Sequence, residues 1–193
     1  MDRDGTISEE VAYVDRVDRF AIYPWTPLAI RKLNLAGIKT VVITNQSGVA
    51  RGLFAESTVE EVHAKLREEL SRAGAFLDGI YYCPHHPEGL VKEYRIQCDC
   101  RKPATGLLHR AARDLHIDLS ASYVIGDKYS DVELAFAAGA RGILVLSGYG
   151  KGEWECNRDV WQRQPHWVAC NLGDAVDLIL NETKGQPRRT PLS

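Results

Sequence analysis

The sequence predicts an α/β fold in which a mostly parallel central sheet carries helices on both faces. Two observations support this prediction. Continuous runs of β-branched and other apolar residues, typical of strands buried on both faces, alternate along the chain with longer segments that have apolar residues at helical spacing. No internal repeat or linker interrupts this alternation, so we expect one domain at residues 1–183 and a polar, disordered tail at residues 184–193.

Local signals place the individual elements. Gly37 directly follows an amphipathic segment and is a natural helix end, while Ser57 and Glu60 have the spacing of a capping box that opens a second helix. We expect His63, on that second helix, at the surface. The expected elements in chain order are helix 24–36, strand 38–45, helix 58–74, strand 77–84, helix 106–116, strand 122–127, helix 130–140, strands 141–148 and 166–171, and helix 172–182.

Composition and charge exclude several classes of function. The formal net charge of −2, without a long basic block, argues against a general nucleic-acid partner. No apolar run is long enough to cross a membrane, and we expect no signal peptide because no basic region is followed by an apolar stretch. Five cysteines, an odd number, then indicate reduced thiols and a cytoplasmic location rather than a disulfide framework.

Polar residues follow the apolar runs that we expect to form buried strands. Thr44 follows "VVI", and Asp127 follows "YVIG". The opening stretch "DRDGT" adds Asp2 and Asp4, provided that a strand precedes them. Because ligands of open α/β sheets bind beyond the carboxyl ends of the strands, we expect these side chains to converge on one crevice.

Three cysteines and a histidine gather in one irregular segment. Cys83 and His85 form one ligand pair with a single intervening residue, Cys98 and Cys100 form another, and twelve residues separate the pairs. Four nitrogen and sulfur ligands suit tetrahedral Zn²⁺, and a site filled by protein ligands alone is structural. We therefore predict a structural zinc site that orders a long loop; His86 is an alternative to His85, and buried free thiols are the alternative to a metal.

Two cations come directly after the last of these cysteines. A metal-bound backbone would present Arg101 and Lys102 in fixed positions, although a solvated pair is the alternative. Lysine offers phosphate a point charge, and arginine offers a planar fork. Arg51 could reach a phosphate as well, or remain solvated.

These residue types together suit phosphoryl transfer through an aspartyl-phosphate. Asp2 can attack phosphorus, and Asp4 can protonate the leaving alkoxide and then take a proton from water. The Thr44 hydroxyl and Lys102 can hold the phosphoryl oxygens as charge develops on them. Two anions need a divalent cation between them, and the carboxylates of Asp2 and Asp127 suit Mg²⁺.

Five stretches, in their order and spacing, resemble the capless haloacid-dehalogenase phosphatases. They are "DRDGT", "TNQSGVARG", "YYCPHHPEG", "CDCRKP" and "SYVIGDKYSD", and the resemblance covers about residues 1–148. It implies a single Rossmann-like domain without a cap domain, in which short loops, including the zinc loop, shape access to the site. It also implies a mostly monomeric protein.

The resemblance further implies roles for individual residues. Asp2 would be the nucleophile and Asp4 the acid/base, and Mg²⁺ would be bound by Asp2, Asp127 and the main-chain carbonyl of Asp4. Thr44 and Lys102 would stabilise the transferring phosphoryl group. Zinc would be bound by Cys83, His85, Cys98 and Cys100. Substrate contacts would fall on Glu10, Val11, Ala12, Tyr13, Thr44, Asn45, Gln46, Ser47, Arg101 and Lys128.

The implied reaction removes the phosphate at C7 of a heptose bisphosphate and leaves the phosphate at C1. This step supplies activated heptose for lipopolysaccharide core or surface glycans, and the sequence leaves the preferred anomer open. The nearest alternative is a histidinol-phosphate phosphatase, which shares the zinc loop. That enzyme has a shorter segment between the ligand pairs and "TNQDG" in place of "TNQSG".

One departure from the family pattern concerns the start of the chain. The family places an apolar strand directly before the nucleophile, but here Met1 stands where the last residue of that strand belongs. We expect the sheet to lack its central member and Asp2 to lie on a frayed terminus. The hypothesis is a start codon set too late. The alternative is a catalytically weak, zinc-stabilised pseudo-phosphatase.

Overall fold

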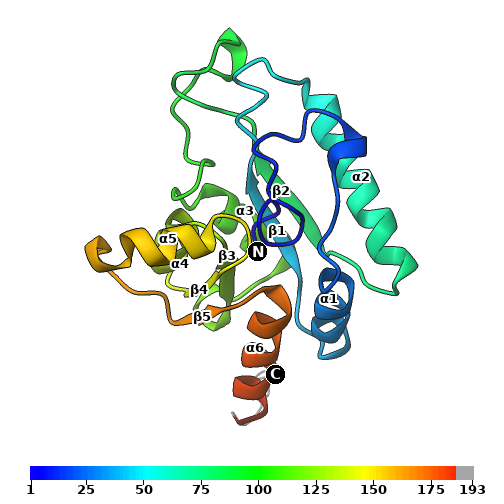
Figure 1. The fold of residues 1–193 in the computed structure, drawn as a ribbon, viewed down its shortest axis with the longest axis vertical. Coiled ribbons are helices and arrows are strands. Elements are labelled where there is room, and N and C mark those ends of the chain that lie inside the picture. The colour runs from blue at the N-terminus through cyan, green and yellow to red at the C-terminus, as the bar shows by residue number, and fades with distance from the viewer. Residues whose placement is uncertain (186–193) are drawn as a thin grey trace.

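The computed structural model describes residues 1–185, and every helix and strand expected from the sequence is present there (Figure 1). The expected tail mostly lies outside the described residues, but its first two positions belong to the last helix. The elements are α1 (Thr26–Leu35), β1 (Val41–Asn45), α2 (Glu56–Arg72), β2 (Gly79–Cys83), α3 (Gly106–Leu115), β3 (Tyr123–Gly126), α4 (Tyr129–Ala137), β4 (Arg141–Val145), α5 (Gly150–Asn157), β5 (Trp167–Ala169) and α6 (Leu172–Gly185).

The strands form two parallel groups with the start of the chain between them. β1 pairs with β2, and β3, β4 and β5 pair in that order. Figure 1 shows the N-terminus at the junction of the two groups. Ile43 N donates to Met1 O at 2.9 Å, and Asp2 N donates to Ile125 O at 2.8 Å. Two residues therefore bridge β1 and β3.

Beyond these two residues, the space between β1 and β3 is a cavity of about 410 Å³. The described strands thus form two groups, β1–β2 and β3–β4–β5, and residues 1–2 lie between them. The expectation that Asp2 lies on a frayed terminus is wrong, because hydrogen bonds on both sides hold residues 1–2, including one of 2.8 Å from the Met1 α-amino group to Val41 O.

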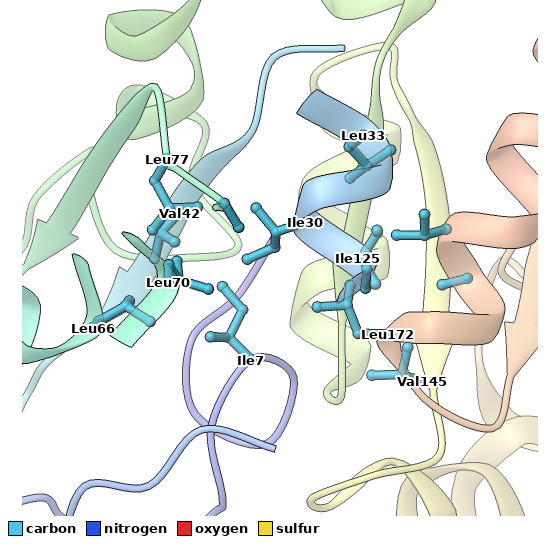
Figure 2. Close-up of a cluster of buried hydrophobic side chains, with 14 of the residues drawn as sticks. Ile7, Ile30, Leu33, Val42, Leu66, Leu70, Leu77, Ile125, Val145 and Leu172 are labelled. Atoms are coloured by element: carbon cyan, nitrogen blue, oxygen red, sulfur yellow. The ribbon is translucent and has the colours of Figure 1, made fainter. Parts of the chain in front are cut away.

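Alternate side chains of the strands feed two cores on opposite faces of the sheet. Val42 and Ile125 point into the core formed with α1, α2 and α6, where Ile30 and Leu172 lie (Figure 2). The neighbouring strand residues, Ile43 among them, point into the other core, formed with α3 and α4. This two-residue alternation explains the continuous apolar runs, since both faces are covered.

One helix is present that the sequence did not predict. α5 contains Gly150 and Gly152, which are poor helix formers, and its apolar residues show no clear helical spacing. Its position follows from tertiary contact, since a side chain on Gly150 would overlap Val145 O. None of the described helices is both long and apolar enough to cross a membrane.

α2 begins close to its predicted start, but the predicted capping box does not form. The helix begins at Glu56 after Ala55, and no side chain caps it. Glu60 does not complete a capping box, because its carboxylate accepts a 2.7 Å hydrogen bond from the Tyr82 hydroxyl. His63 is also misplaced by the sequence reading: it is 4% exposed rather than on the surface.

Candidate active site

The strand ends bring together the charged residues that the sequence singled out. Thr44 lies in β1, Asp127 directly follows β3, and Asp2 lies between these strands. The ammonium of Lys102 reaches this point from the cysteine-rich loop and lies 2.8 Å from Asp2 and 2.7 Å from Asp131. All five side chains are buried. The predicted convergence on one crevice is confirmed, and Asp131 is an addition to it.

Lys102 and Asp2 keep each other charged in this buried position. Burial alone opposes the positive charge, but the carboxylates of Asp131 and Asp2 outweigh it and raise the pKa of Lys102. Burial likewise opposes the negative charge of Asp2. The Lys102 ammonium and the Arg3 backbone N–H, which donates at 2.7 Å, nevertheless hold the pKa of Asp2 below its usual range. Asp2 is therefore an ionised carboxylate at neutral pH.

Asp127 is held tightly but is only half satisfied. Its Oδ2 accepts a 2.9 Å hydrogen bond from Tyr149 N, whereas its buried Oδ1 has no hydrogen-bond partner. Gly5 and Gly148 press against the carboxylate, since a side chain on either glycine would overlap Oδ2. Burial and the negative charge of Asp2 raise the pKa of Asp127 to about 8. A buried, unpartnered carboxylate oxygen beside another carboxylate is a place for a cation.

The carboxylates fit a divalent metal ion. One oxygen from each of Asp2, Asp127 and Asp131 lies within 4.8 Å of the others. Hard oxygen donors of this kind suit Mg²⁺. The sequence named Asp2 and Asp127, with the main-chain carbonyl of Asp4 as a third ligand, and that third ligand stays a prediction. Asp131 is not among the predicted ligands, and its position also suits the first turn of α4, where its Oδ2 accepts from Lys128 N at 3.3 Å.

Asp4 is fixed by Arg3, a buried arginine to which the sequence analysis assigns no role. Arg3, 1% exposed, donates from Nε to Asp4 Oδ1 at 3.0 Å and from a terminal nitrogen to Oδ2 at 2.9 Å. Gln46 adds a third donor at 2.9 Å and accepts from Arg3 at the same distance. This network orients the Asp4 carboxylate at the mouth of the crevice. Only adjacency to the two aspartates could have pointed to Arg3.

His63 lies behind this arginine. Its Nε2 is 3.2 Å from the second terminal nitrogen of Arg3. Burial, with the positive charges of Arg3 and Arg67, lowers the pKa of His63 to about 3. The imidazole is thus neutral at pH 7 and accepts a hydrogen bond from the guanidinium. The sequence offered no signal for this contact, because it joins residues sixty positions apart.

The side chains of the "TNQ" stretch form hydrogen bonds with other groups of the protein. The Gln46 amide donates to Thr44 Oγ1 at 3.0 Å, which orients the hydroxyl. The Asn45 side chain accepts from Lys102 N at 3.0 Å and donates to Lys102 O at 3.2 Å, so it fixes the loop that carries the lysine. Asn45 and Gln46, expected as substrate contacts, therefore also position their neighbours.

A cavity of about 600 Å³ opens over the charged cluster. Most of the expected substrate contacts line it, but Val11 does not: its side chain packs against the hydrophobic core. The lining also includes residues that the sequence did not assign, such as Tyr149 and Glu153. The full lining is Asp2, Asp4, Glu10, Ala12, Tyr13, Val14, Thr44, Asn45, Gln46, Ser47, Gly48, Arg51, Arg101, Lys102, Lys128, Ser130, Tyr149 and Glu153.

Cationic side chains border this cavity. The Lys128 ammonium lies 3.5 Å from Glu10 and 4.6 Å from the centre of the Tyr149 ring. Arg101 donates to His85 O at 3.4 Å, and Arg51 contacts His86 Nε2 at 3.0 Å. The two arginines are therefore attached to the loop that contains the cysteines. A cavity bordered in this way suits an anionic ligand.

The four predicted zinc ligands meet at one point. Cys83, His85, Cys98 and Cys100 each place one ligand atom within 4.8 Å of the others. The Cys100 thiol lies 3.0 Å from that of Cys83, 3.2 Å from that of Cys98 and 3.2 Å from His85 Nδ1. His86 is directed to Arg51 instead, so the geometry favours His85 over the alternative. One nitrogen and three sulfurs suit tetrahedral Zn²⁺.

Comparison with known proteins identifies the family. A family model described as HAD-hydrolase-like matches residues 99–175. A D-glycero-beta-D-manno-heptose-1,7-bisphosphate 7-phosphatase from Escherichia coli (strain K12) is 47% identical over 187 residues, which cover 95% of this chain and 94% of the relative. The chain belongs to the heptose-bisphosphate phosphatase family. A relative of the same name from Yersinia pestis is 41% identical and covers 93% of both chains.

Comparison with solved structures shows that this member of the heptose-bisphosphate phosphatase family also resembles known phosphatases in its fold. A D,D-heptose 1.7-bisphosphate phosphatase from B. bronchiseptica, complexed with magnesium and phosphate, has a TM-score of 0.83 and 32% identity, covering 94% of this chain and 96% of that one. A putative HAD-like phosphatase from Mesorhizobium loti has a TM-score of 0.79 and 33% identity, covering 97% and 87%. The chain is therefore a phosphomonoester hydrolase with the predicted haloacid-dehalogenase fold.

Proposed function

We propose that the protein removes the C7 phosphate of D-glycero-D-manno-heptose 1,7-bisphosphate and leaves heptose 1-phosphate, through an aspartyl-phosphate on Asp2. The observation that carries the proposal is the ionised Asp2 carboxylate, held 2.8 Å from the Lys102 ammonium under a cavity with a cationic border. Both the named relatives and the "TNQSG" stretch favour this substrate over histidinol phosphate.

In the first step, Asp2 attacks phosphorus and the bond from phosphorus to the sugar oxygen breaks. Lys102 and the Thr44 hydroxyl stabilise the charge that spreads over the phosphoryl oxygens. Asp4, oriented by Arg3 and Gln46, gives its proton to the departing alkoxide. The products of this step are the sugar alcohol and a phosphoryl group on Asp2.

In the second step, Asp4 takes a proton from water as the water oxygen bonds to phosphorus. The bond between phosphorus and the Asp2 oxygen breaks, which releases inorganic phosphate and restores the Asp2 carboxylate. The proton that Asp4 lost in the first step is thereby replaced. General acid and base help of this kind is worth about 10²–10⁴ in rate.

Both metals belong to the proposal. Mg²⁺, held by Asp2 and Asp127 with the Asp4 carbonyl or Asp131 nearby, would offset the repulsion between the nucleophile and the phosphate. Cys83, His85, Cys98 and Cys100 would hold a structural Zn²⁺. The zinc site fixes the loop that carries Arg101 and Lys102, because Cys100 directly precedes them.

The proposed partner is a small phosphosugar, with Glu10, Ala12, Tyr13, Ser47, Arg101 and Lys128 as the side chains around its sugar and its retained phosphate. We propose a monomer without nucleic-acid or membrane partners. The proposed location is the cytoplasm, where three adjacent thiols stay reduced for metal binding. The proposed role is the supply of activated heptose for lipopolysaccharide or related glycans.

Phosphate release from purified protein with Mg²⁺ tests the proposal on both anomers of the bisphosphate and on histidinol phosphate. Asp2→Asn should lower kcat/KM for the bisphosphate by about 10⁴-fold or more. Asp15→Asn is the matched control, because Asp15 is exposed and pairs with Arg19 at the surface. Preference for histidinol phosphate would establish the alternative substrate, and no Mg²⁺-dependent release from any substrate would establish a pseudo-phosphatase.

A further inference from the structure

α5 forms part of the wall of the active-site cavity. Tyr149, directly before the helix, and Glu153, one turn further along, both line the cavity of about 600 Å³ over the charged cluster. Both residues lie beyond residues 1–148, the part of the chain that resembles the family motifs. The motifs therefore assign no role to this wall, and its role has to come from its contacts and its chemistry.

The start of α5 is attached directly to the catalytic cluster. Tyr149 N donates to Asp127 Oδ2 at 2.9 Å, and Ser147 Oγ donates to Gly5 O at 2.6 Å. Glu153 N in turn donates to Tyr149 O at 2.9 Å, in the first turn of the helix. These hydrogen bonds fix the backbone at Glu153 relative to the carboxylate of Asp127.

Stacked aromatic rings hold another side of α5. The Trp161 ring stacks on the ring of Tyr129, the first residue of α4, with ring centres 4.5 Å apart and planes inclined by 10°. The Trp154 ring of α5 lies 6.0 Å from the same Trp161 ring. Since successive helix residues point about 100° apart, this packing of Trp154 leaves the neighbouring Glu153 side chain free to face the cavity.

The carboxylate of Glu153 is a hydrogen-bond acceptor that the protein itself does not use. Within residues 1–185, the Glu153 side chain makes no hydrogen bond or ion pair. Glu10, which also lines the cavity, differs: its carboxylate accepts from Ala12 N at 2.6 Å and lies 3.5 Å from the Lys128 ammonium. Of these two acids, Glu153 is thus the one with its full accepting capacity available to a ligand.

Two cations of the cavity border lie across from α5. Arg51 and Arg101 contact the loop that follows β2, whereas α5 follows β4. β2 and β4 lie on opposite sides of residues 1–2 in the order of the strands. Arginine attracts a phosphate group and a glutamate repels it, whereas hydroxyl groups donate hydrogen bonds to a carboxylate. The two sides of the cavity therefore suit different parts of a phosphosugar.

We propose that Glu153 is a specificity-determining residue, whose carboxylate accepts hydrogen bonds from hydroxyl groups of the heptose and directs the retained phosphate toward the arginine side. The inference rests on the proposed function and adds the group that recognises the sugar. Tyr149 supports this role, because its ring is 46% exposed and offers an apolar surface to the carbon-bound hydrogens of a sugar. The Lys128 ammonium lies 4.6 Å from the centre of that ring.

Two bisphosphates separate recognition of hydroxyl groups from recognition of phosphate. One is the heptose bisphosphate, and the other is the bisphosphate of an unbranched alkanediol of the same chain length, which has no free hydroxyl. We expect Glu153→Ala to raise KM for the heptose bisphosphate about tenfold, with kcat changed less than about threefold, and not to raise KM for the alkanediol bisphosphate. Glu153→Gln keeps an acceptor and should give an intermediate KM.

Glu155→Ala is the matched control on the same helix. Glu155 is exposed, does not line the cavity and lies 4.0 Å from Lys151, so this variant should leave both KM values unchanged. Inhibition of aryl phosphate hydrolysis by heptose 1-phosphate and by the alkanediol bisphosphate gives a second measurement that needs no turnover of either compound. Glu153→Ala should raise the inhibition constant of heptose 1-phosphate alone, again about tenfold.

The outcomes separate this inference from the proposed function. Weaker binding of the sugar compounds alone, in Glu153→Ala but not in Glu155→Ala, supports the inference. Equal weakening of the sugar and alkanediol compounds, no weakening of either, or the same effect in Glu155→Ala overturns it and leaves the proposed function standing. Phosphate release from the aryl phosphate but not from the heptose bisphosphate, in the unsubstituted protein, overturns the proposed function and this inference with it.

Discussion

The two ends of the short bridge at residues 1–2 differ sharply in the side chains that surround them. At the carboxyl end, Asp2 meets Lys102, the Arg3 N–H and, through its own N–H, Ile125. At the amino end, the Met1 α-amino group donates to Val41 O and adjoins a cavity of about 410 Å³ with largely apolar walls. The first region is a network of partnered charges, and the second is an apolar cavity between β1 and β3.

This difference separates what positions a catalytic group from what stabilises a fold. Direct hydrogen bonds and ion pairs hold Asp2 in place. Stability instead depends on the apolar area that the side chains around the cavity bury. We therefore expect substitutions in the charged network to change rate most, and substitutions of the apolar side chains around the cavity to change stability most.

Among the changes that bear on this comparison, the largest effect is expected at Lys102. Lys102→Met removes the ammonium that holds Asp2 and the phosphoryl oxygens, so kcat/KM should fall by about 10²–10³-fold. It also leaves Asp2 and Asp131 buried without their cation, which costs about 3–5 kcal/mol of unfolding free energy. Steady-state kinetics and urea unfolding measure the two effects.

Leu134→Ala is the matched variant on the other side of the comparison. Leu134 is fully buried and lines the cavity between β1 and β3, but not the cavity over the charged cluster. It should lose about 2–5 kcal/mol of unfolding free energy with kcat changed less than about threefold. A rate loss equal to that of Lys102→Met would contradict the separation.

Removal of zinc should affect both regions through the loop. A strong chelator should lower Tm by about 10 °C or more, because the metal stabilises a segment with little core of its own. Activity should fall with it, since Cys100 adjoins Arg101 and Lys102. Thermal scans and phosphate release before and after chelation measure this, with Zn²⁺ added back as the control. Unchanged activity, measured with Mg²⁺ supplied, in protein shown to be zinc-free would separate the loop from catalysis.

A smaller and more selective effect is expected at His63, through its contact with Arg3. His63→Leu removes the acceptor that faces Arg3 and should loosen the clamp on Asp4. We expect about a tenfold loss of kcat/KM with the sugar phosphate, whose alkoxide needs a proton, and little loss with an aryl phosphate, whose leaving group does not.

Two controls make the His63 result interpretable. His63→Gln keeps an acceptor and should restore much of the rate. Asp4→Asn should show the same leaving-group dependence in stronger form. If Asp4→Asn shows this leaving-group dependence but His63→Leu lowers kcat/KM equally for both substrates, His63 has only a structural role.

A further effect concerns pH and Mg²⁺. Burial and the charge of Asp2 raise the pKa of Asp127 to about 8, above its unfolded value of 3.8. The raised pKa stabilises the metal-free fold below pH 3.8, and this contribution is lost as pH rises through about 8. Mg²⁺ must displace this proton at pH 6 but not at pH 9, so its stabilising effect should grow by up to about 1.4 kcal/mol for each pH unit up to that pKa.

Thermal scans with and without Mg²⁺ at several pH values measure this dependence. Asp127→Asn is the control and should show little Mg²⁺ stabilisation at any pH. An equal effect of Mg²⁺ at pH 6 and pH 9 would mean that Asp127 is already ionised in the metal-free protein.

The parts of the molecule that the sequence predicts are those governed by local pattern. Buried strands appear as runs of β-branched residues, and Thr44 and Asp127 stand at the ends of two such runs. The zinc ligands are close in sequence as well as in space.

The parts that the sequence does not predict depend on distant contacts. Arg3 looks like an ordinary exposed cation, and its burial follows from His63 on α2 and Gln46 after β1. Asp131 resembles a helix-capping residue until Lys102 is placed beside it. α5 has glycines where a helix former is expected, and its position comes from packing at the end of β4.

The stereochemical course at phosphorus tests the central claim, that Asp2 receives the phosphoryl group before water does. An isotopically chiral sugar phosphate is hydrolysed by the protein with Mg²⁺, and the configuration of the transferred group is determined. Two successive displacements, at Asp2 and then by water, each invert phosphorus, so we expect overall retention. Overall inversion would show direct attack by water and would contradict the role of Asp2 as nucleophile.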